Sequence, residues 1–433
     1  MNKYRNIVPG TELAFSNGMN VLLGRNGTGK TTLLELIAAL MQSGPIARAD
    51  EELDIEYDVL VGDDEYRVSL TNRLSESGPV PAEWSLADAI KIDWSQKRDW
   101  SFRVGLLEGG RVREFLSSSP MGTDVPSEWG LTTPIPVRDP FREQGPLHQA
   151  LSVRHQIAVS KFKEALAQGT SAEADKNLAS LVSHLHGLYE QHGGRFDEGL
   201  GTFLAIVDEK GSKPAFLRYI KQFSFTFVRF IPSELRERAY EHIRDSGASD
   251  IRISSQDLPF LKRTVELMGG REAKMLLRLQ KEESAEAGGN SSYGEFEFVI
   301  TDEDGSVFRH DYLSFGQKRL LSFLYYAAAN PDIIIADELV NGLHHEWIDV
   351  CLREIADRQC FLTSQNPLLL DYLTFNSAEE VSRAFILCDR QKEGHRTALL
   401  YQHIDAASAD SFFRAYRAGL QHVSEILRTK GLW

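Results

Sequence analysis

Two adjacent carboxylates, Asp337 and Glu338, follow directly on the apolar run 333–336. A continuous apolar run of this kind is typical of a strand that is buried on both faces. A carboxylate at the end of such a strand can hold Mg²⁺ through its water shell, and a neighbouring carboxylate can orient or deprotonate a water molecule. We therefore expect this pair of carboxylates to act on a metal ion and on water.

A glycine-rich segment, GRNGTGKTT, lies near the N-terminus between the apolar run 20–23 and the apolar stretch 33–40. A glycine-rich loop between a strand and a helix is the arrangement of a phosphate-binding loop. Its glycines let the backbone wrap a β-phosphate, while Lys30 reaches the β- and γ-phosphate oxygens and the Thr31 hydroxyl ligates Mg²⁺. The residues predicted to contact the nucleotide here are Gly24, Arg25, Asn26, Gly27, Thr28, Gly29, Lys30, Thr31 and Thr32.

A second anion site is predicted at the turn 313–317, LSFGQ, which enters an apolar helix that stops before Pro331. The N-terminus of a helix presents unpaired N–H groups and a partial positive charge. Ser314, Gly316 and Gln317 are the predicted ligands in this turn.

These three segments, in this order, resemble the Walker A, signature and Walker B motifs of the ATP-binding cassette (ABC) class of P-loop ATPases. The resemblance implies ATP and Mg²⁺ as cofactors, with Lys30, Glu338 and Gln365 as catalytic residues and Thr31 and Asp337 on the metal. In this class the signature closes on the ATP held by a partner copy. The expected assembly is therefore a two-fold dimer that encloses two ATP molecules, or a higher assembly of such dimers.

Two departures from the family pattern affect these expectations. Gln365 stands where the family usually has a switch histidine; glutamine can donate a hydrogen bond but cannot become charged, so we expect slow turnover. The segment 341–345, NGLHH, is similar to the corresponding segment of short-armed SMC-like ATPases, and it places His344 or His345 at the dimer interface. The glutamine of the family's Q-loop has four candidates, which are Gln96, Gln144, Gln149 and Gln156.

The predicted fold class is α/β: an ABC-type P-loop ATPase core, with a mixed parallel sheet and an antiparallel β layer, that carries a large and mainly helical insertion. Alternating apolar residues predict antiparallel hairpins at 53–70, 100–112 and 295–308, and closing strands at 384–388 and 397–402. The predicted domains are an N-terminal lobe at 1–116, the insertion at 117–290 and a C-terminal lobe at 291–433.

Helices are predicted in the insertion near 147–168, 173–192, 234–245 and 257–283, after a loop or linker at 117–146, and one amphipathic helix is predicted at 409–428. No heptad repeat is sustained, which excludes a long coiled-coil arm. The stretch from Phe216 to Arg238 interleaves aromatic and basic residues, which can grip single-stranded nucleic acid. However, the alternation of Phe223, Phe225 and Phe227 favours a buried strand. For Tyr4, stacking on adenine and a place in the core are both open.

The 433-residue chain has a net charge of −14 and a pI near 5.4, which argues against a protein that coats nucleic acid non-specifically, although a local basic groove stays open. Its three cysteines lack CxxC spacing, so reduced thiols are expected. The sequence shows no signal peptide and no membrane-spanning stretch, which predicts a cytoplasmic protein without a membrane partner.

The resemblance points to three kinds of ATPase. A transporter subunit is disfavoured by the length of the insertion. The first hypothesis is an ATPase of the OLD-like anti-phage group that acts as sensor and scaffold for a separate effector, a nuclease or toxin, as in two-gene systems of the PARIS or Septu type. The residues after 338 are expected to complete the ATPase sheet, which leaves no room for a nuclease. The alternative is a DNA-repair ATPase of the RecF or SMC type, with DNA as its partner.

Overall fold

The computed structural model describes residues 1–41, 51–74, 98–129, 140, 145–168, 203–206, 216, 220, 222–226, 231–247, 249–282, 290–355, 357–393 and 396–433. The helix predicted near 173–192 and the glutamines Gln96 and Gln144 lie outside these residues. The chain forms two compact units. Unit 1 comprises Met1–Glu12, Ala39–Phe196 and Arg390–Tyr401, and unit 2 comprises Leu13–Ala38, Asp197–Asp389 and Gln402–Trp433. The three domains expected from the sequence remain a prediction.

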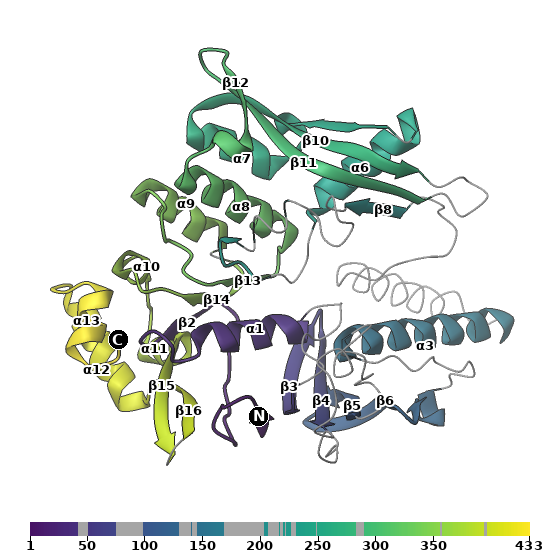
Figure 1. The fold of residues 1–433 in the computed structure, drawn as a ribbon. Coiled ribbons are helices and arrows are strands. Elements are labelled where there is room, and N and C mark those ends of the chain that lie inside the picture. Colours follow the sequence, from purple (N-terminus) through teal and green to yellow (C-terminus); the bar gives the residue numbers. More distant parts are fainter. Residues whose placement is uncertain are drawn as a thin grey trace, which may run out of the picture. The chain divides into compact units, whose positions relative to one another are not determined.

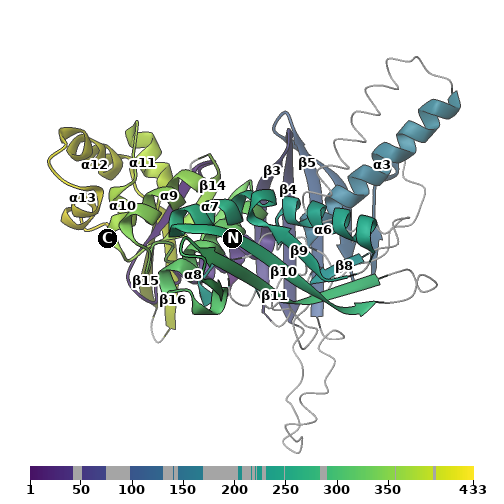
Figure 2. The same ribbon diagram turned by 90° about the horizontal axis from the view of Figure 1, so that it is seen from above.

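Unit 1 is built on an antiparallel sheet with the order β1-β3-β4-β5-β6-β7. Its strands are β1 (Lys3–Tyr4), β3 (Leu53–Val61), β4 (Asp64–Leu74), β5 (Arg98–Glu108), β6 (Arg111–Ser119) and β7 (Gly122–Asp124). The hairpins predicted at 53–70 and 100–112 are therefore confirmed, and β7 is a short strand inside the stretch that was expected to be a loop. Helix α3 (Pro146–Gln168) begins beside this sheet and extends beyond it (Figure 2). Near the start of α3, Arg154 donates hydrogen bonds to Asp64 and Tyr66.

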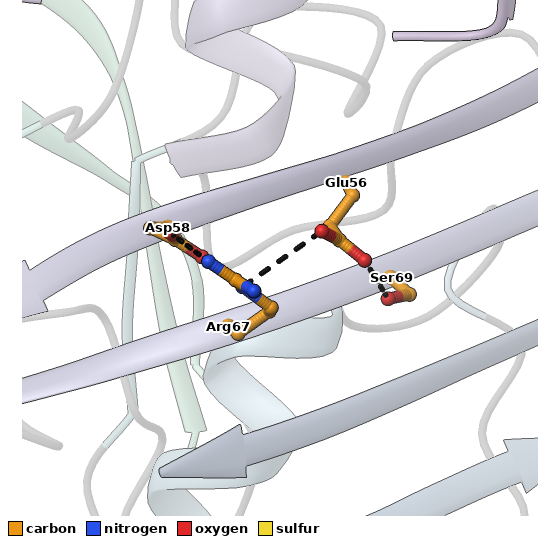
Figure 3. A network of polar contacts seen from close by, with 4 residues as sticks. All are labelled: Glu56, Asp58, Arg67 and Ser69. Atoms are coloured by element: carbon orange, nitrogen blue, oxygen red, sulfur yellow. Dashed lines mark hydrogen bonds and ion pairs between the residues drawn. The ribbon is translucent and has the colours of Figure 1, made fainter. Parts of the chain in front are cut away.

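One face of this sheet is polar, as the alternation of β3 and β4 predicts. Arg67 donates two hydrogen bonds of 2.7 Å to Asp58 on the neighbouring strand and lies 3.8 Å from Glu56 (Figure 3). The Ser69 hydroxyl donates to the same glutamate at 3.1 Å. Cross-strand pairs of this kind fix the register, and each contributes only about 0.2–1 kcal/mol at an exposed site.

Several residues with an open role at the sequence level lie in unit 1. Tyr4 is buried in β1, with the Arg5 guanidinium 5.0 Å from its ring, which favours the core alternative over adenine stacking. Gln149 is buried and Gln156 is exposed, both on α3.

A five-stranded sheet has the order β13-β14-β2-β15-β16; its first three strands belong to unit 2, whereas the end of β15 and most of β16 belong to unit 1. Its strands are β2 (Met19–Leu23), β13 (Ile333–Ala336), β14 (Gln359–Thr363), β15 (Phe385–Glu393) and β16 (Arg396–His403). The first four of these in sheet order, β13, β14, β2 and β15, pair in parallel. Because these strands are parallel, the carboxyl ends of β2, β13 and β14 lie at the same edge of the sheet, where ligands bind in open parallel sheets.

Helices of unit 2 begin beside this sheet edge or cover the sheet (Figure 1). They are α1 (Lys30–Met41), α8 (Phe315–Ala329), α9 (His345–Ile355), α10 (Pro367–Asp371), α11 (Ala378–Ala384), α12 (Ala406–Ala418) and α13 (Val423–Thr429). The last three bury Phe385 and Phe412 together with Val21 of β2. The helix predicted at 409–428 is wrong as one element, because Gly419 adopts a left-handed conformation, with φ of 68°, and ends α12.

A second sheet of unit 2 has the order β12-β11-β10-β9, and β8 pairs with β11. It consists of β8 (Phe203–Ile206), β9 (Ile251–Ser254), β10 (Gly270–Glu282), β11 (Asn290–Asp302) and β12 (Val307–Arg309), with helices α6 (Ser233–Ser246) and α7 (Pro259–Met268). The hairpin predicted at 295–308 and the helices predicted near 147–168 and 234–245 are confirmed. The helix predicted over 257–283 is wrong beyond Met268, because Gly269 ends α7 at a φ of 73° and β10 pairs with strands on both sides.

Aromatic side chains fill the core between this second sheet and α8. Phe216 packs on Phe296, Phe298 and Tyr325 with ring centroids 4.7–5.1 Å apart. Phe223 and Phe225 are buried in the same cluster. This confirms the core interpretation for Phe223 and Phe225, but the predicted strand is wrong, because Phe223 lies in a turn and Phe225 makes only an isolated bridge to Ala336. Phe227 lies outside the described residues.

All three cysteines, Cys351, Cys360 and Cys388, are buried and unpaired, as expected. Burial raises the pKa of Cys360 and of Cys388 to about 12, which keeps both thiols protonated. Across the part of the chain that the structure describes, every helix is too short or too polar to cross a membrane.

Candidate functional site

The glycine-rich loop 24–29 connects β2 to α1 and is held by contacts within the loop. Thr28 donates from its N–H and its hydroxyl to the Arg25 carbonyl, at 3.3 and 2.8 Å. Gly24 tolerates no side chain, because a Cβ there would lie 2.3 Å from the Cys388 carbonyl oxygen and 2.7 Å from the Thr28 hydroxyl. The Lys30 ammonium donates to the carbonyls of Gly24 and Arg25, at 2.8 and 3.2 Å, so it lies inside the curve of the loop.

Asp337 connects this loop to the end of β13. Its Oδ2 accepts a 2.5 Å hydrogen bond from the Thr31 hydroxyl, and its Oδ1 accepts one from the Thr363 hydroxyl at the end of β14. The structure therefore brings together the two predicted metal ligands, which are 306 positions apart in the sequence. Three elements contribute to this group of hydrogen bonds: helix α1, which follows β2, and the carboxyl ends of β13 and β14.

Glu338 lies beside this group in a left-handed conformation, with φ of 54°. Such a conformation is strained for a non-glycine residue and costs about 1–3 kcal/mol, and strain of this kind concentrates at functional sites. Its N–H donates to the Thr363 hydroxyl at 3.0 Å, and its Oε2 accepts from the Gln365 N–H at 3.0 Å. Its Oε1 is buried and has no hydrogen-bond partner among the described residues.

The predicted signature turn has the expected helix N-terminus. Ser314 caps α8 through a capping box: its hydroxyl accepts from the Gln317 N–H at 3.3 Å, and the Gln317 Oε1 accepts from its N–H at 2.9 Å. Ser314 and Phe315 are exposed. A Cβ at Gly316 would lie 2.8 Å from the Gly342 carbonyl oxygen, so this turn packs directly against the loop that follows Glu338.

The residues present fit ATP and Mg²⁺. Glycines at 24, 27 and 29, the N-terminus of α1 and the Lys30 ammonium offer N–H and ammonium donors to phosphate oxygens. Thr31 and Asp337 offer two oxygen ligands side by side, which is the donor type that Mg²⁺ prefers. The Oε1 of Glu338, which no described residue contacts by a hydrogen bond, can accept one from a water molecule.

Three contributors to this site were not predicted from the sequence. The Thr363 hydroxyl donates to the Asp337 carboxylate and accepts from the Glu338 N–H. The Ser224 carbonyl accepts from the Asp337 N–H at 3.0 Å. Arg319 of α8 donates to the main-chain carbonyls of residues 337–339. The sequence offered two signals for these residues: the hydroxyl of Thr363 at the last position of a buried strand, and Arg319 within an apolar helix.

His344 and His345 lie exposed at the start of α9, with ring centroids 4.3 Å apart. With Glu346 they form the one group of three candidate metal ligands found among the described residues, with ligand atoms within 4.8 Å of one another. The three residues are adjacent in the sequence, and all three side chains are exposed. Their expected place at a dimer interface stays a prediction.

Comparisons with known proteins agree with this picture in part. A family profile described as "AAA domain" matches residues 1–97. Similar solved structures include the Smc head domain of Pyrococcus furiosus bound to the C-terminal domain of ScpA (12% identity, 93% of this chain and 94% of that chain, TM-score 0.31). The SMC head domain from Thermotoga maritima is also similar (10% identity, 93% of this chain and 96% of that chain, TM-score 0.31). A search of curated proteins gave no match.

Similarity at these identities and TM-scores supports no argument by itself. The class of fold is therefore assigned from the strand order and the geometry of the site. The phosphate-binding loop follows the central strand β2 of the parallel sheet, and the two carboxylates follow the edge strand β13, separated from β2 by β14. With an antiparallel sheet in the same unit, this arrangement defines the α/β core of an ABC-type P-loop ATPase. All the predicted site residues belong to unit 2.

Proposed function

We propose that this chain is a Mg²⁺-dependent ATPase of the ABC class. The observation that carries the proposal is the continuous hydrogen-bonded group of Thr31, Asp337, Thr363, Glu338 and Gln365, which joins the phosphate-binding loop to two carboxylates. In this arrangement Lys30 neutralises phosphate charge, Thr31 and Asp337 hold the metal, and Glu338 orients or deprotonates the attacking water. The bound Mg²⁺ supplies electrostatic stabilisation of the phosphate charge that develops during hydrolysis.

The test is phosphate release from ATP by the purified chain. We expect turnover with Mg²⁺, none after EDTA treatment, and none in Lys30→Ala at saturating Mg²⁺. Glu379→Gln is the matched control, because this exposed glutamate of α11 forms its ion pair with Arg383 at the surface. Activity that survives in Lys30→Ala would indicate a contaminating enzyme and would count against the proposal.

The second part of the proposal is self-association around ATP. Ser314 is exposed at the tip of α8, and its hydrogen bonds among the described residues go to Gln317 and Lys318 of its own helix. Its helix N-terminus therefore faces solvent and is available to the phosphates bound by a second copy. Sedimentation with and without ATP tests this step.

The third part concerns the role of the ATPase. We propose that it acts as sensor and scaffold for a separate effector, a nuclease or toxin, in anti-phage defence. The compact ATPase core supports this assignment, since the described residues after Glu338 build its strands and helices. Cells that carry the gene with its neighbours should resist phage, and Lys30→Ala should abolish resistance. Sensitivity to DNA damage without any effect on phage would favour the DNA-repair alternative.

A further inference from the structure

Arg319 is a charged residue inside the apolar helix α8, and its side chain is only 4% exposed. Its guanidinium donates to the Leu339 carbonyl at 3.0 Å, to the Phe223 carbonyl at 3.0 Å and to the Asp337 carbonyl at 3.4 Å, and it also donates to the Glu338 carbonyl. Among the described residues it therefore hydrogen-bonds main-chain carbonyls and no carboxylate. A buried arginine without a paired carboxylate is uncommon, because burial of a charge is costly unless dipoles replace the lost water.

The surroundings of Arg319 keep it protonated in spite of burial. Desolvation lowers the pKa of Arg319 to about 10, and the charges of Glu338 and Asp337 partly oppose this shift. The guanidinium also lies 5.4 Å from the Phe225 ring centroid and 5.9 Å from that of Phe223. These contacts let the side chain stay charged near neutral pH, so that the four carbonyl contacts are charge-assisted hydrogen bonds.

Three of these four carbonyls belong to consecutive residues, 337–339, which we call the acidic turn. The central residue of this turn is Glu338, whose left-handed backbone persists only if its surroundings hold it there. The planar fork of Arg319 contacts the carbonyls of this turn, while the Thr363 hydroxyl accepts from the Glu338 N–H and the Gln365 N–H donates to the Glu338 carboxylate. The direction of the Glu338 carboxylate therefore depends on where Arg319 lies.

Arg319 also lies five residues after Ser314 on the same helix, within the first turns of α8. At that end the packing is tight. A Cβ at Gly342 would lie 2.3 Å from the Phe315 ring, and one at Gly316 would lie 2.8 Å from the Gly342 carbonyl oxygen. A displacement of the Ser314 end of α8 therefore has to move the acidic turn and its following loop as well. Closely packed elements transmit small shifts instead of absorbing them.

We propose that Arg319 is a positioning residue that couples the Ser314 end of α8 to the Glu338 carboxylate of the same chain. Contact of Ser314 with the phosphates of a second copy shifts α8, and Arg319 carries this shift to the acidic turn, so that Glu338 reaches its working orientation only in the assembled state. This inference rests on the proposed ATPase function and adds to it a route by which assembly controls hydrolysis.

The variant that tests it is Arg319→Lys, which keeps the charge and loses the fork that spans several carbonyls. We expect kcat to fall by about 10- to 100-fold, as for a small misplacement of a catalytic group, with KM for ATP and the Kd of a non-hydrolysable ATP analogue unchanged within about twofold. The matched control is Arg358→Lys. Arg358 also donates to main-chain carbonyls, those of Ala327 and Asn330, but at the far end of α8 and before β14.

A double-mutant cycle separates coupling from a local effect. If Arg319 transmits the contact made by Ser314, the variant Ser314→Ala/Arg319→Lys should lose little more kcat than the worse single variant. Additive losses would overturn the coupling, and so would wild-type kcat in Arg319→Lys or an equal loss in Arg358→Lys.

Should Arg319→Lys fail to fold, Gly342→Ala provides a second test, because it displaces the packing at Phe315 and leaves Arg319 in place. We expect the same pattern of lower kcat with unchanged affinity for the analogue; unchanged kcat in a folded Gly342→Ala would contradict the proposal. A wild-type chain without any turnover would instead refute the ATPase function itself, so the two failures are distinguishable.

Discussion

At the scale of single residues, Glu338 concentrates most of the proposed chemistry. Its main chain is strained, one carboxylate oxygen is fixed by the Gln365 N–H, and the other oxygen has no partner among the described residues. A carboxylate held by one oxygen in this way keeps its second oxygen available for a water molecule. This asymmetry distinguishes Glu338 from Asp337, both of whose oxygens accept hydroxyl hydrogen bonds.

Glu338→Gln should reduce kcat by about 100-fold or more, the usual effect of losing a general base, while ATP still binds. The amide keeps the size of the side chain but cannot take a proton from water. Bound ATP then persists and should hold copies together, so sedimentation with saturating ATP is expected to show a dimer or larger species. Recovery of this variant as a monomer under those conditions would count heavily against the shared-site mechanism.

Gln365 offers two groups with separable roles. Its N–H positions Glu338, and any residue except proline retains that contact. Its side chain is exposed, and we propose that it donates to the γ-phosphate in place of the family's histidine. Gln365→Ala should then lower kcat by about 10- to 100-fold, as for loss of one donor to developing charge. Gln365→His should restore much of it; wild-type kcat in the alanine variant would remove the side chain from the mechanism.

The site residues were predictable where their spacing is local and not where they depend on the neighbouring strand. Asp337 and Glu338 follow directly on an apolar strand, and Lys30 and Thr31 follow a glycine-rich loop, so the sequence predicted roles for all four; the structure places Thr31 against Asp337. Thr363 could not be found in this way, because its role requires β14 to lie next to β13. No local pattern states which strands are neighbours.

At the scale of elements, composition misled the prediction where pairing decides the structure. The sequence of β10, GREAKMLLRLQKE, consists mostly of good helix formers, yet it pairs with β9 and β11 on both sides. A left-handed glycine ends the helix on its N-terminal side, at Gly269, as Gly419 does for α12. Both glycines can be read in the sequence, and they mark the ends of α7 and α12 better than the periodicity of apolar residues did.

The hairpin of β11 and β12 leads to the signature turn, and its stability should depend on pH through His310. Its Nδ1 accepts from the Phe298 N–H at 3.1 Å, and burial lowers the pKa of His310, although Asp311 and Glu297 oppose this shift and Arg309 adds to it. Because the folded pKa lies below the unfolded value, this contribution to stability is complete above about pH 6.5 and is lost as the pH falls.

His310→Gln should therefore reduce the pH dependence of stability. Urea unfolding at pH 7.5 and pH 5 measures the difference for both proteins, and the difference should be smaller in the variant because an amide does not titrate. Equal differences in the two proteins would show that His310 does not become charged on unfolding in this range.

At the scale of the whole molecule, the proposed composite site makes two inactive variants complement each other. Lys30→Ala lacks a working phosphate loop, and Ser314→Arg cannot complete a partner's site. A mixed dimer contains one intact combination, so random mixing should restore about a quarter of the wild-type rate. The measurement is ATP turnover of the mixture against that of each variant alone.

The control for this experiment is the double variant Lys30→Ala/Ser314→Arg. Mixed with either single variant it provides no intact combination, and it should restore nothing. Full activity of Ser314→Arg alone would show that each copy contains a complete site.

The central position of β2 has a consequence for the synthesis of the chain. Its two neighbours in the sheet, β14 and β15, pair with it through contacts such as Cys360 with Met19 and Phe385 with Val21, more than three hundred residues apart. Sheets closed by such distant segments fold slowly. On the ribosome, the strand before the phosphate loop therefore stays unpaired on both edges until β14 and β15 have emerged. A nascent chain that stalls before residue 359 should expose β2 to chaperones and to aggregation.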